Sequence, residues 1–130
     1  MIVVDASALL DILLRTPAAP ALEAQAFATG QSLHAPHLVD VEVMQVLRRY
    51  VAHGEINAAR AHHALDDFAS LRLARYPHHP FLARIWELRA SITAYDAAYV
   101  ALAEALGAPL LTSDRRLAKT SGHRARIITA

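Results

Sequence analysis

The sequence of 130 residues contains no cysteine, one tryptophan and very little lysine. The lack of cysteine excludes a disulfide framework and any metal site with thiolate ligands. No apolar run approaches the roughly 18 residues that a membrane-spanning helix needs. The first residues lack the basic segment that opens a secretory signal peptide, so we expect the mature chain to begin at Met1 and to be cytoplasmic.

A large net charge is also missing. The 13 basic and 12 acidic residues leave a formal charge of +1 at pH 7. This balance creates no global positive field, so a nucleic-acid-binding role would require a local patch. Lys119 is the only lysine, and the other basic residues are all arginine. Because 55% of the residues are hydrophobic, we expect one ordered domain spanning 1–130 rather than a disordered chain.

Two motifs that carry well-known chemistry are absent. The chain has no G-x-x-x-x-G-K-[ST] phosphate-binding loop and no H-E-x-x-H zinc motif. His62 and His63 are neighbours on a predicted helix, so their side chains point to different faces and chelate poorly together. Each precedes an aspartate by four residues, Asp66 or Asp67, which predicts exposed side-chain pairs rather than a metal site.

Short apolar segments alternate with helical patterns along the chain. We predict strands at Ile2–Val4, Ser32–Ala35, Leu73–Tyr76, Pro109–Thr112 and Arg126–Thr129. We predict helices at Ala8–Leu14, Val39–Tyr50, Ile56–Leu73, Phe81–Ile92, Tyr95–Leu106 and Arg115–Thr120, with a helix break or start near Pro17 and Pro20. This alternation is typical of an α/β fold with helices on both faces of a mainly parallel sheet. Ligands of such folds bind beyond the carboxyl ends of the strands.

Three aspartates occupy positions where a helix begins. Asp5 ends the first predicted strand, and Asp114 follows the fourth. Either could simply cap the next helix, because aspartate is a favoured N-cap residue. Asp96 lies three residues after Thr93, at the spacing of a capping box with Asp in place of the usual Glu. Taken alone, each aspartate therefore has a purely structural explanation.

Glu42 has no such explanation. On the predicted helix Val39–Tyr50 it lies three residues after Val39 and four before Val46, along the apolar stripe. Glutamate is rarely buried without a partner, and the helix dipole stabilises it there by typically less than about 1 kcal/mol. We therefore expect a positive group beside this carboxylate.

The four acids are predicted to converge at one edge of the sheet. Residues that follow strands lie at the carboxyl edge, and helix starts face the same edge in alternating α/β folds. Two carboxylates about 5 Å apart repel by roughly 3 kcal/mol at an effective dielectric constant of about 20. No lysine lies near them in the sequence, which favours a bound divalent cation. Oxygen ligands suit Mg²⁺ or Mn²⁺, ions that activate water and stabilise phosphoryl transition states.

At these residues the chain resembles PIN-domain ribonucleases and, more narrowly, the VapC toxins of bacterial toxin–antitoxin pairs. The resemblance rests on the order and spacing of the segments VVDASALLDIL, VEVMQVLRR, TAYDAAYVALAEALGAPLLTSDRRL and RIIT. It implies a PIN-like three-layer α/β/α fold with the first strand central, and an endoribonuclease that depends on Mg²⁺ or Mn²⁺. The region from Ala52 to His79 matches only in being helical, so the resemblance implies no particular RNA.

The resemblance also implies roles for single residues. The catalytic and metal-binding acids of the family match Asp5, Glu42, Asp96 and Asp114. Asp5 and Asp96 match the most direct ligands, and the other two match groups that serve a second site or position water. Ser7 and Thr112 match small hydroxyls that orient carboxylates or water. Attack by metal-activated water on RNA would leave a 5′-phosphate and a 3′-hydroxyl.

Two pairs of arginines lie near these segments. Arg115 and Arg116 directly follow Asp114, so they are either solvated helix residues or contacts to RNA phosphate beside the metal. Arg48 and Arg49 are assigned to surface charge.

The resemblance implies a homodimer formed by helices that flank the active-site edge. One predicted helix carries Trp86, Leu88 and Ile92, an apolar surplus that agrees with such an interface. Trp86 is the only tryptophan and lies in a helical apolar pattern, which indicates packing in the core or at an interface.

The first predicted helix is apolar nearly all round. Between Ala8 and Leu14 its only charge is Asp11. A helix of a small domain normally shows a polar face to water, so we expect some of its leucines to be exposed and to mark an interaction site. The resemblance implies a cognate antitoxin that lays apolar anchors on a groove formed by this helix. The residues assigned to this contact are Leu9, Leu10, Leu13 and Leu14.

Two other functions fit an acidic α/β domain. A phosphoacceptor receiver domain would bind a divalent metal at the same cluster, but it needs a lysine after a late strand. Lys119 lies past Asp114 in a predicted helix instead. A non-catalytic module could also bind the metal, although a scaffold gains nothing from four mutually repelling acids. The ribonuclease interpretation is therefore preferred.

Overall fold

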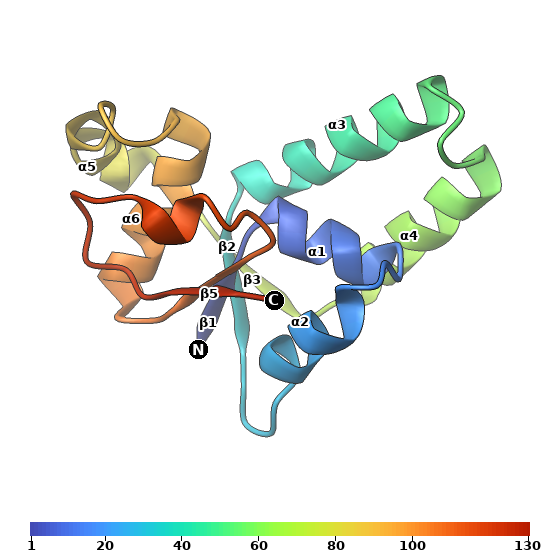
Figure 1. Cartoon of the computed structure of the whole chain (residues 1–130), viewed down its shortest axis with the longest axis horizontal. Coiled ribbons are helices and arrows are strands. Elements are labelled where there is room, and N and C mark those ends of the chain that lie inside the picture. The colour runs from blue at the N-terminus through green and yellow to red at the C-terminus, as the bar shows by residue number, and fades with distance from the viewer.

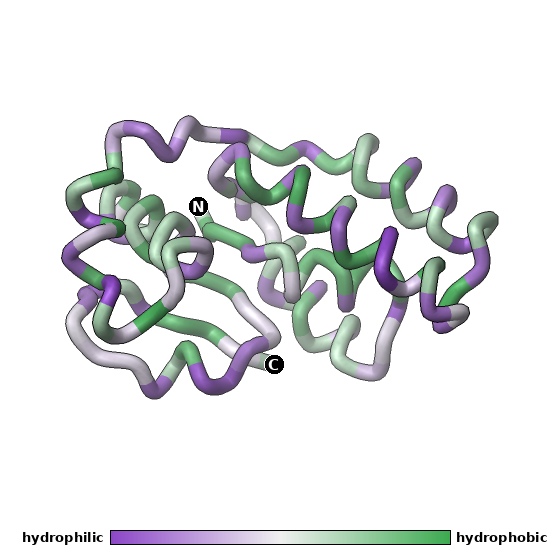
Figure 2. Tube along the Cα trace, turned by 90° about the horizontal axis from the view of Figure 1, so that it is seen from above, coloured by the Kyte–Doolittle hydropathy of each residue, from purple (hydrophilic) through white to green (hydrophobic).

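The computed structural model describes all residues 1–130. Five parallel strands form one sheet in the order β3-β2-β1-β4-β5. Their bounds are β1 (Ile2–Val4), β2 (Leu33–Pro36), β3 (Leu73–Tyr76), β4 (Leu110–Thr112) and β5 (Ile127–Thr129). Strand β1 is central, as predicted, and all three of its residues are buried. Figure 2 shows the hydrophobic stretch that begins at the N-terminus, an unbroken apolar run typical of a strand covered on both faces.

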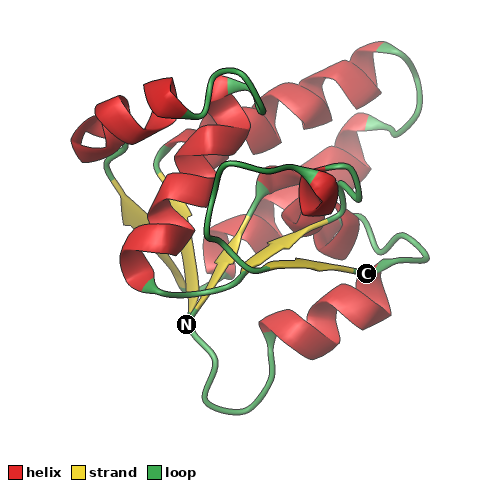
Figure 3. Cartoon of the chain, turned by 60° about the vertical axis from the view of Figure 1, so that its left-hand side comes forward, coloured by secondary structure: helices red, strands yellow, loops and turns green.

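Helices cover both faces of the sheet (Figures 1 and 3). Their bounds are α1 (Ala6–Leu13), α2 (Ala19–Ala26), α3 (Leu38–Ala52), α4 (Ala58–Ser70), α5 (Leu82–Glu87) and α6 (Ala94–Leu106), with 3-10 turns η1 (His79–Phe81) and η2 (Leu117–Lys119). Helix α6 packs on β1, β2 and β4, and α5 packs on α6. Helices α1 and α2 contact β4 on the other side, and α3 and α4 pack against α1.

The strand order creates a topological switch beside β1. The chain passes from β1 outward through β2 to β3, and later returns to form β4 on the other side of β1. Val3 is in register with Leu110 and Val4 with Leu111, so β1 and β4 end at the same level. Asp5 and Asp114 follow these two ends, at the position where open α/β sheets bind ligands.

The predicted helix ends are confirmed where glycine follows. Gly54 comes two residues after α3 with φ 72°, and Gly107 caps α6 with φ 61°. Only glycine adopts this left-handed backbone without strain, which ends a helix in a defined direction. No helix of the structure is both long and apolar enough to span a membrane.

Three helices are shorter in the structure than the sequence pattern predicts. The helix expected over 56–73 is shortened to α4, because Asn57 caps it by accepting from Arg60 N and Leu71 already has extended backbone. The helix expected over 81–92 is wrong in extent, since only α5 is α-helical and turns follow it up to Thr93. The short helix expected over 115–120 is reduced to η2.

The exposure predicted for the first helix is wrong. Leu9, Leu10 and Leu13 are buried, and only Leu14 is partly exposed. Helices α2, α3 and α4 all pack against α1, so its neighbours enclose this short helix. A charged residue at Leu13 would therefore disrupt the core rather than probe a surface.

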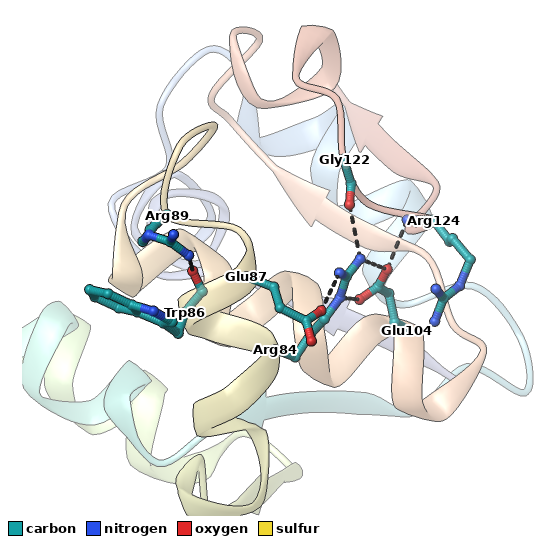
Figure 4. Close-up of polar contacts among 7 residues, drawn as sticks. All are labelled: Arg84, Trp86, Glu87, Arg89, Glu104, Gly122 and Arg124. Atoms are coloured by element: carbon teal, nitrogen blue, oxygen red, sulfur yellow. Dashed lines mark hydrogen bonds and ion pairs between the residues drawn. The ribbon is translucent and has the colours of Figure 1, made fainter.

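A polar cluster joins α5 to α6 and to the segment before β5 (Figure 4). Arg84 donates to both carboxylate oxygens of Glu104, at 2.8 and 3.0 Å. The same guanidinium donates to Glu87 and to the carbonyl oxygen of Gly122, each at 2.9 Å. Arg124 N also donates to Glu104, at 2.8 Å. Because the Glu104 side chain is only 5% exposed, this bidentate pairing fixes the position of α5 against α6.

Trp86 is not a core residue. It is 67% exposed, and the guanidinium carbon of Arg89 lies 4.6 Å from the centroid of its ring (Figure 4). Leu88, from the same predicted apolar surplus, is buried, and Ile92 is partly buried. Of the two roles foreseen for Trp86, core packing is excluded and interface packing stays a prediction.

Candidate active site

A cleft of about 820 Å³ opens beside the carboxyl ends of β1 and β4. It lies between the start of α1, one face of α3 and the first turns of α6. Its lining includes all four acids singled out in the sequence: Asp5, Glu42, Asp96 and Asp114. The fold thus brings four carboxylates from separate segments into one cavity.

Asp5 is the most deeply placed of these acids, at 6% exposure. Its Oδ1 accepts from Ala8 N at 3.0 Å and from Ser7 Oγ at 2.7 Å, and its Oδ2 accepts from Thr112 Oγ1. Burial raises the pKa of Asp5 above its usual value and the charge of Asp96 adds to the rise, whereas the hydrogen bonds oppose it. Asp5 is therefore both the N-cap of α1 and a carboxylate of the cleft.

The two predicted hydroxyls hold Asp5 and the segment that carries Asp114. Ser7 and Thr112 each donate their single hydroxyl proton to Asp5, so their oxygens are left to accept from N–H groups. Ser113 N donates to Ser7 Oγ, and Asp114 N donates to Thr112 Oγ1, both at 3.0 Å. These bonds fix residues 112–114 against the start of α1.

Asp11 is a fifth acid of the cleft, and our sequence analysis did not assign it to the site. Its carboxylate accepts from Thr16 Oγ1 at 2.9 Å and from Ser113 Oγ. The signal that could have found it is its spacing, because a residue four positions after Ser7 lies on the same helical face. Asp11 thus ties the second half of α1 to the loop that follows β4.

Glu42 faces the cleft with a neutral partner. Tyr99, buried in α6, donates its hydroxyl to Glu42 Oε1 at 2.6 Å. Burial raises the pKa of Glu42, and the charges of Asp5 and Asp96 raise it further, against the effect of the Tyr99 bond. Burial and the bond to Glu42 also raise the pKa of Tyr99, which keeps its hydroxyl a donor. No basic side chain pairs with Glu42, so no protein group of this chain supplies the positive partner that its position suggested.

Asp96 and Asp114 complete the acidic end of the cleft. Asp96 N donates to the Thr93 hydroxyl at 3.1 Å, as the capping-box spacing predicts. Burial raises the pKa of Asp96, the charge of Asp114 raises it further, and Arg116 partly offsets both. Asp114 accepts from Arg116 N at 2.9 Å and from its guanidinium at 3.3 Å. Arg115 donates instead to the carbonyl of the last residue, and neither arginine lines the cleft.

The donor set fits a hard divalent cation that keeps part of its water. All the charged groups at this end of the cleft offer oxygen, which Mg²⁺ and Mn²⁺ prefer. No group of three acidic or histidine side chains is gathered closely enough to hold an ion by itself. Mg²⁺ normally retains several waters and binds through one or two carboxylates, so such an enclosure is not required. Burial, followed by mutual repulsion, raises the pKa values of Asp5, Glu42 and Asp96, and a cation would offset both effects.

Comparison with known proteins identifies the family. The chain is 48% identical to VapC ribonuclease Mb0985 of Mycobacterium bovis over 120 residues, covering 92% of this chain and 91% of that protein. It is 43% identical to ribonuclease VapC12 of Mycobacterium tuberculosis over 127 residues, covering 98% and 97%. The PIN domain family matches residues 2–122. The chain belongs to the PIN-domain family, among the VapC ribonucleases.

The fold of this PIN domain is shared by solved structures. VapBC2 from Rickettsia felis, crystallised with a DNA fragment from its promoter, gives a TM-score of 0.72 at 16% identity, covering 99% of this chain and 98% of that chain. PAE2754 from Pyrobaculum aerophilum gives 0.69 at 29% identity, covering 97% and 82%. The predicted PIN-like three-layer α/β/α fold is thereby confirmed. A receiver domain is not favoured, because Lys119 is exposed on η2 and does not line the cleft.

Proposed function

We propose that this PIN domain is a Mg²⁺- or Mn²⁺-dependent endoribonuclease and the toxin of a type II toxin–antitoxin pair, acting in the cytoplasm. One observation carries the proposal: four carboxylates from separate segments converge in one cleft at the topological switch of the sheet. The relatives named as VapC ribonucleases, which match nearly the whole chain, support the same activity.

Asp5 and Asp96 are the proposed direct ligands of the cation, and Glu42 and Asp114 reach it directly or through water. When bound, the ion lowers the pKa of water and stabilises charge on the phosphate. Ser7 and Thr112 each hold one of the two oxygens of Asp5 in place. The supporting role of these hydroxyls is thus to orient the carboxylate rather than to react.

Glu42 is the proposed acceptor of the proton from the attacking water. Tyr99 occupies only Oε1 of Glu42, which leaves Oε2 free to accept a proton. The raised pKa of Glu42 makes this carboxylate a stronger base. A new bond forms between the water oxygen and phosphorus while the bond from phosphorus to O3′ breaks. O3′ takes up a proton from solvent water and leaves as a 3′-hydroxyl, and the other product carries a 5′-phosphate.

Cleavage of labelled RNA tests the activity. Purified protein with Mn²⁺ should cut single-stranded or total cellular RNA, and sequencing of the new ends should find 5′-phosphates. Asp96→Asn, which keeps the shape and the backbone cap, should cut at least about 100-fold more slowly. The endoribonuclease proposal is wrong if the wild-type chain leaves all these RNAs intact with either metal.

Metal titration separates the enzyme from a non-catalytic module. Calorimetry with Mn²⁺ should show binding to the wild-type chain and much weaker binding to Asp5→Asn and Asp96→Asn. Metal binding without any cleavage of RNA would favour the non-catalytic alternative. Strong binding that survives both substitutions would place the ion elsewhere.

A cognate antitoxin is the proposed protein partner. Since Leu9, Leu10 and Leu13 are buried, the contact proposed for the first helix is reduced to Leu14, which is partly exposed. Leu14→Glu should weaken antitoxin binding in a pull-down while the chain stays folded. Unchanged binding would move the contact away from α1.

A homodimer is the proposed assembly. Helix α5 exposes Leu82 at 53% and Trp86 at 67%, a large apolar area for a helix of six residues. Light scattering at micromolar concentration should give the mass of two chains, and Trp86→Glu should shift it toward one. A wild-type monomer under these conditions would refute the assembly.

A further inference from the structure

The cleft continues along α3 beyond the acids. Its lining includes Arg49 and Tyr50, near the far end of the helix from Glu42. Glu42 and Arg49 are seven residues apart, which is two turns, so they share a helical face and lie about 10 Å apart along the axis. Arg49 was assigned to surface charge from the sequence; it is exposed, and the structure adds that it lines the cleft.

Arg49 is the only basic residue that lines the cleft, whereas five lining residues are acidic. Its side chain takes part in none of the salt bridges of the structure. Its guanidinium carbon lies 5.7 Å from the centroid of the Tyr50 ring, within the range of a cation–π contact. The guanidinium is therefore exposed, without a carboxylate partner, and next to an aromatic face.

We propose that Arg49, supported by Tyr50, is a phosphate-binding subsite for a single RNA strand that runs along α3 from the acidic end of the cleft. This inference rests on the proposed ribonuclease function. A guanidinium can bind phosphate through two parallel hydrogen bonds, and cation and aromatic pairs in grooves bind single strands without sequence preference. With one phosphate per about 3.4 Å of a stacked strand, Arg49 meets a phosphate up to about three nucleotides from the reacting one.

Arg48 provides a matched control on the same helix. It is adjacent in sequence and also exposed, but it lines an apolar groove between α3 and α4 with Met44 and Leu65. Replacing either arginine by alanine removes one positive charge from the same part of the chain. The two variants differ in whether that charge faces the cleft.

Binding is measured by fluorescence anisotropy with a 5′-labelled, mixed-sequence single-stranded RNA and Mn²⁺. The full chain carries Asp96→Asn throughout, so that the RNA stays uncut. Adding Arg49→Ala should weaken binding about fivefold to tenfold and reduce the slope of log affinity against log salt by about 0.7. Arg49→Lys should keep the slope because it keeps the charge, and Arg48→Ala should change affinity by less than about twofold.

Equal effects of Arg48→Ala and Arg49→Ala, or no effect of either, overturn the subsite. A change in molar mass by light scattering on Arg49→Ala also overturns it, because Arg49 would then serve contacts between chains. In cleavage assays with all acids present, Arg49→Ala should raise KM more than it lowers kcat. If the wild-type chain cuts RNA and Arg49→Ala has the same KM, only the subsite is refuted; if the wild-type chain neither binds nor cuts RNA, the proposed function is refuted as well.

Discussion

Replacing the same charge at two places in the cleft should change stability in opposite directions. Folding raises the pKa of Asp96, so its ionised form is less favourable in the folded chain than in the unfolded one. Asp96→Asn removes a partly buried charge and its repulsion with Asp114 and Asp5, and it loses only the attraction of Arg116 and of the helix dipole. Its backbone cap on Thr93 is kept.

For a partly exposed, solvent-screened carboxylate, we expect Asp96→Asn to stabilise the metal-free chain at pH 7 by about 0.5–1 kcal/mol. This corresponds to a rise in Tm of about 2–4 °C for a domain of this size. Because the destabilisation requires the ionised form, it disappears as the pH falls through the raised pKa toward the usual value of 3.8. The Tm difference should therefore shrink in acid.

Asp5→Asn should do the reverse. In Asp5→Asn an amide nitrogen, which cannot accept a hydrogen bond, replaces the oxygen that accepts from the Thr112 hydroxyl. Thr112 cannot turn away easily, because its Oγ1 accepts from Asp114 N. A buried donor then faces another donor, which costs about 1–3 kcal/mol and lowers Tm. Scanning calorimetry in EDTA measures both variants against the wild-type chain. If Asp96→Asn melts at or below the wild type at pH 7, the acids do not repel as argued here.

Three further outcomes follow from the same contacts. Mn²⁺ at 100 times its Kd should stabilise the wild-type chain by about 2.7 kcal/mol. The stabilisation should be smaller at acid pH, where protons compete with the ion for the carboxylates. An equal rise in the Tm of Asp96→Asn would contradict the proposed ligand set. Arg84→Met should lower the free energy of unfolding in urea by about 2–3 kcal/mol, because the Glu104 side chain, which is only 5% exposed, loses its guanidinium partner and keeps only the bond from Arg124 N. Arg84 lowers the pKa of Glu104, so this stabilisation is present above the usual Glu104 pKa of 4.5 and is lost as the pH falls through the lowered value. The difference in unfolding free energy between the wild-type chain and Arg84→Met should therefore shrink in acid. Asp11→Leu should reduce RNA cleavage by roughly tenfold by loosening Ser113, while Asp11→Asn, whose amide oxygen still accepts from that hydroxyl, should retain most activity; equal losses would show that the bond to Ser113 does not matter.

The sequence determined the elements and the edge of the sheet that carries the acids. Strand β1 follows from three adjacent apolar residues, and the caps at Asp5 and Thr93 follow from favoured N-cap residues placed before helical patterns. These signals are local, because capping and helical periodicity act between residues within about four positions. Once the strands are parallel, residues that follow them share one edge, so the convergence of Asp5 and Asp114 was predictable.

Only the tertiary structure decided what each side chain meets at that edge. The partner of Glu42 is Tyr99, 57 residues away, and the partner of Asp11 is Ser113, 102 residues away. The leucines of α1 are buried because three helices from later in the chain pack around it, and no periodicity within α1 encodes their arrival. Arg49 faces the acidic cleft and Arg48 does not, although they are sequence neighbours of the same type. Local free energies choose a helix and its bounds, whereas packing between distant helices sets the rotation of that helix and so determines which of its side chains line the site.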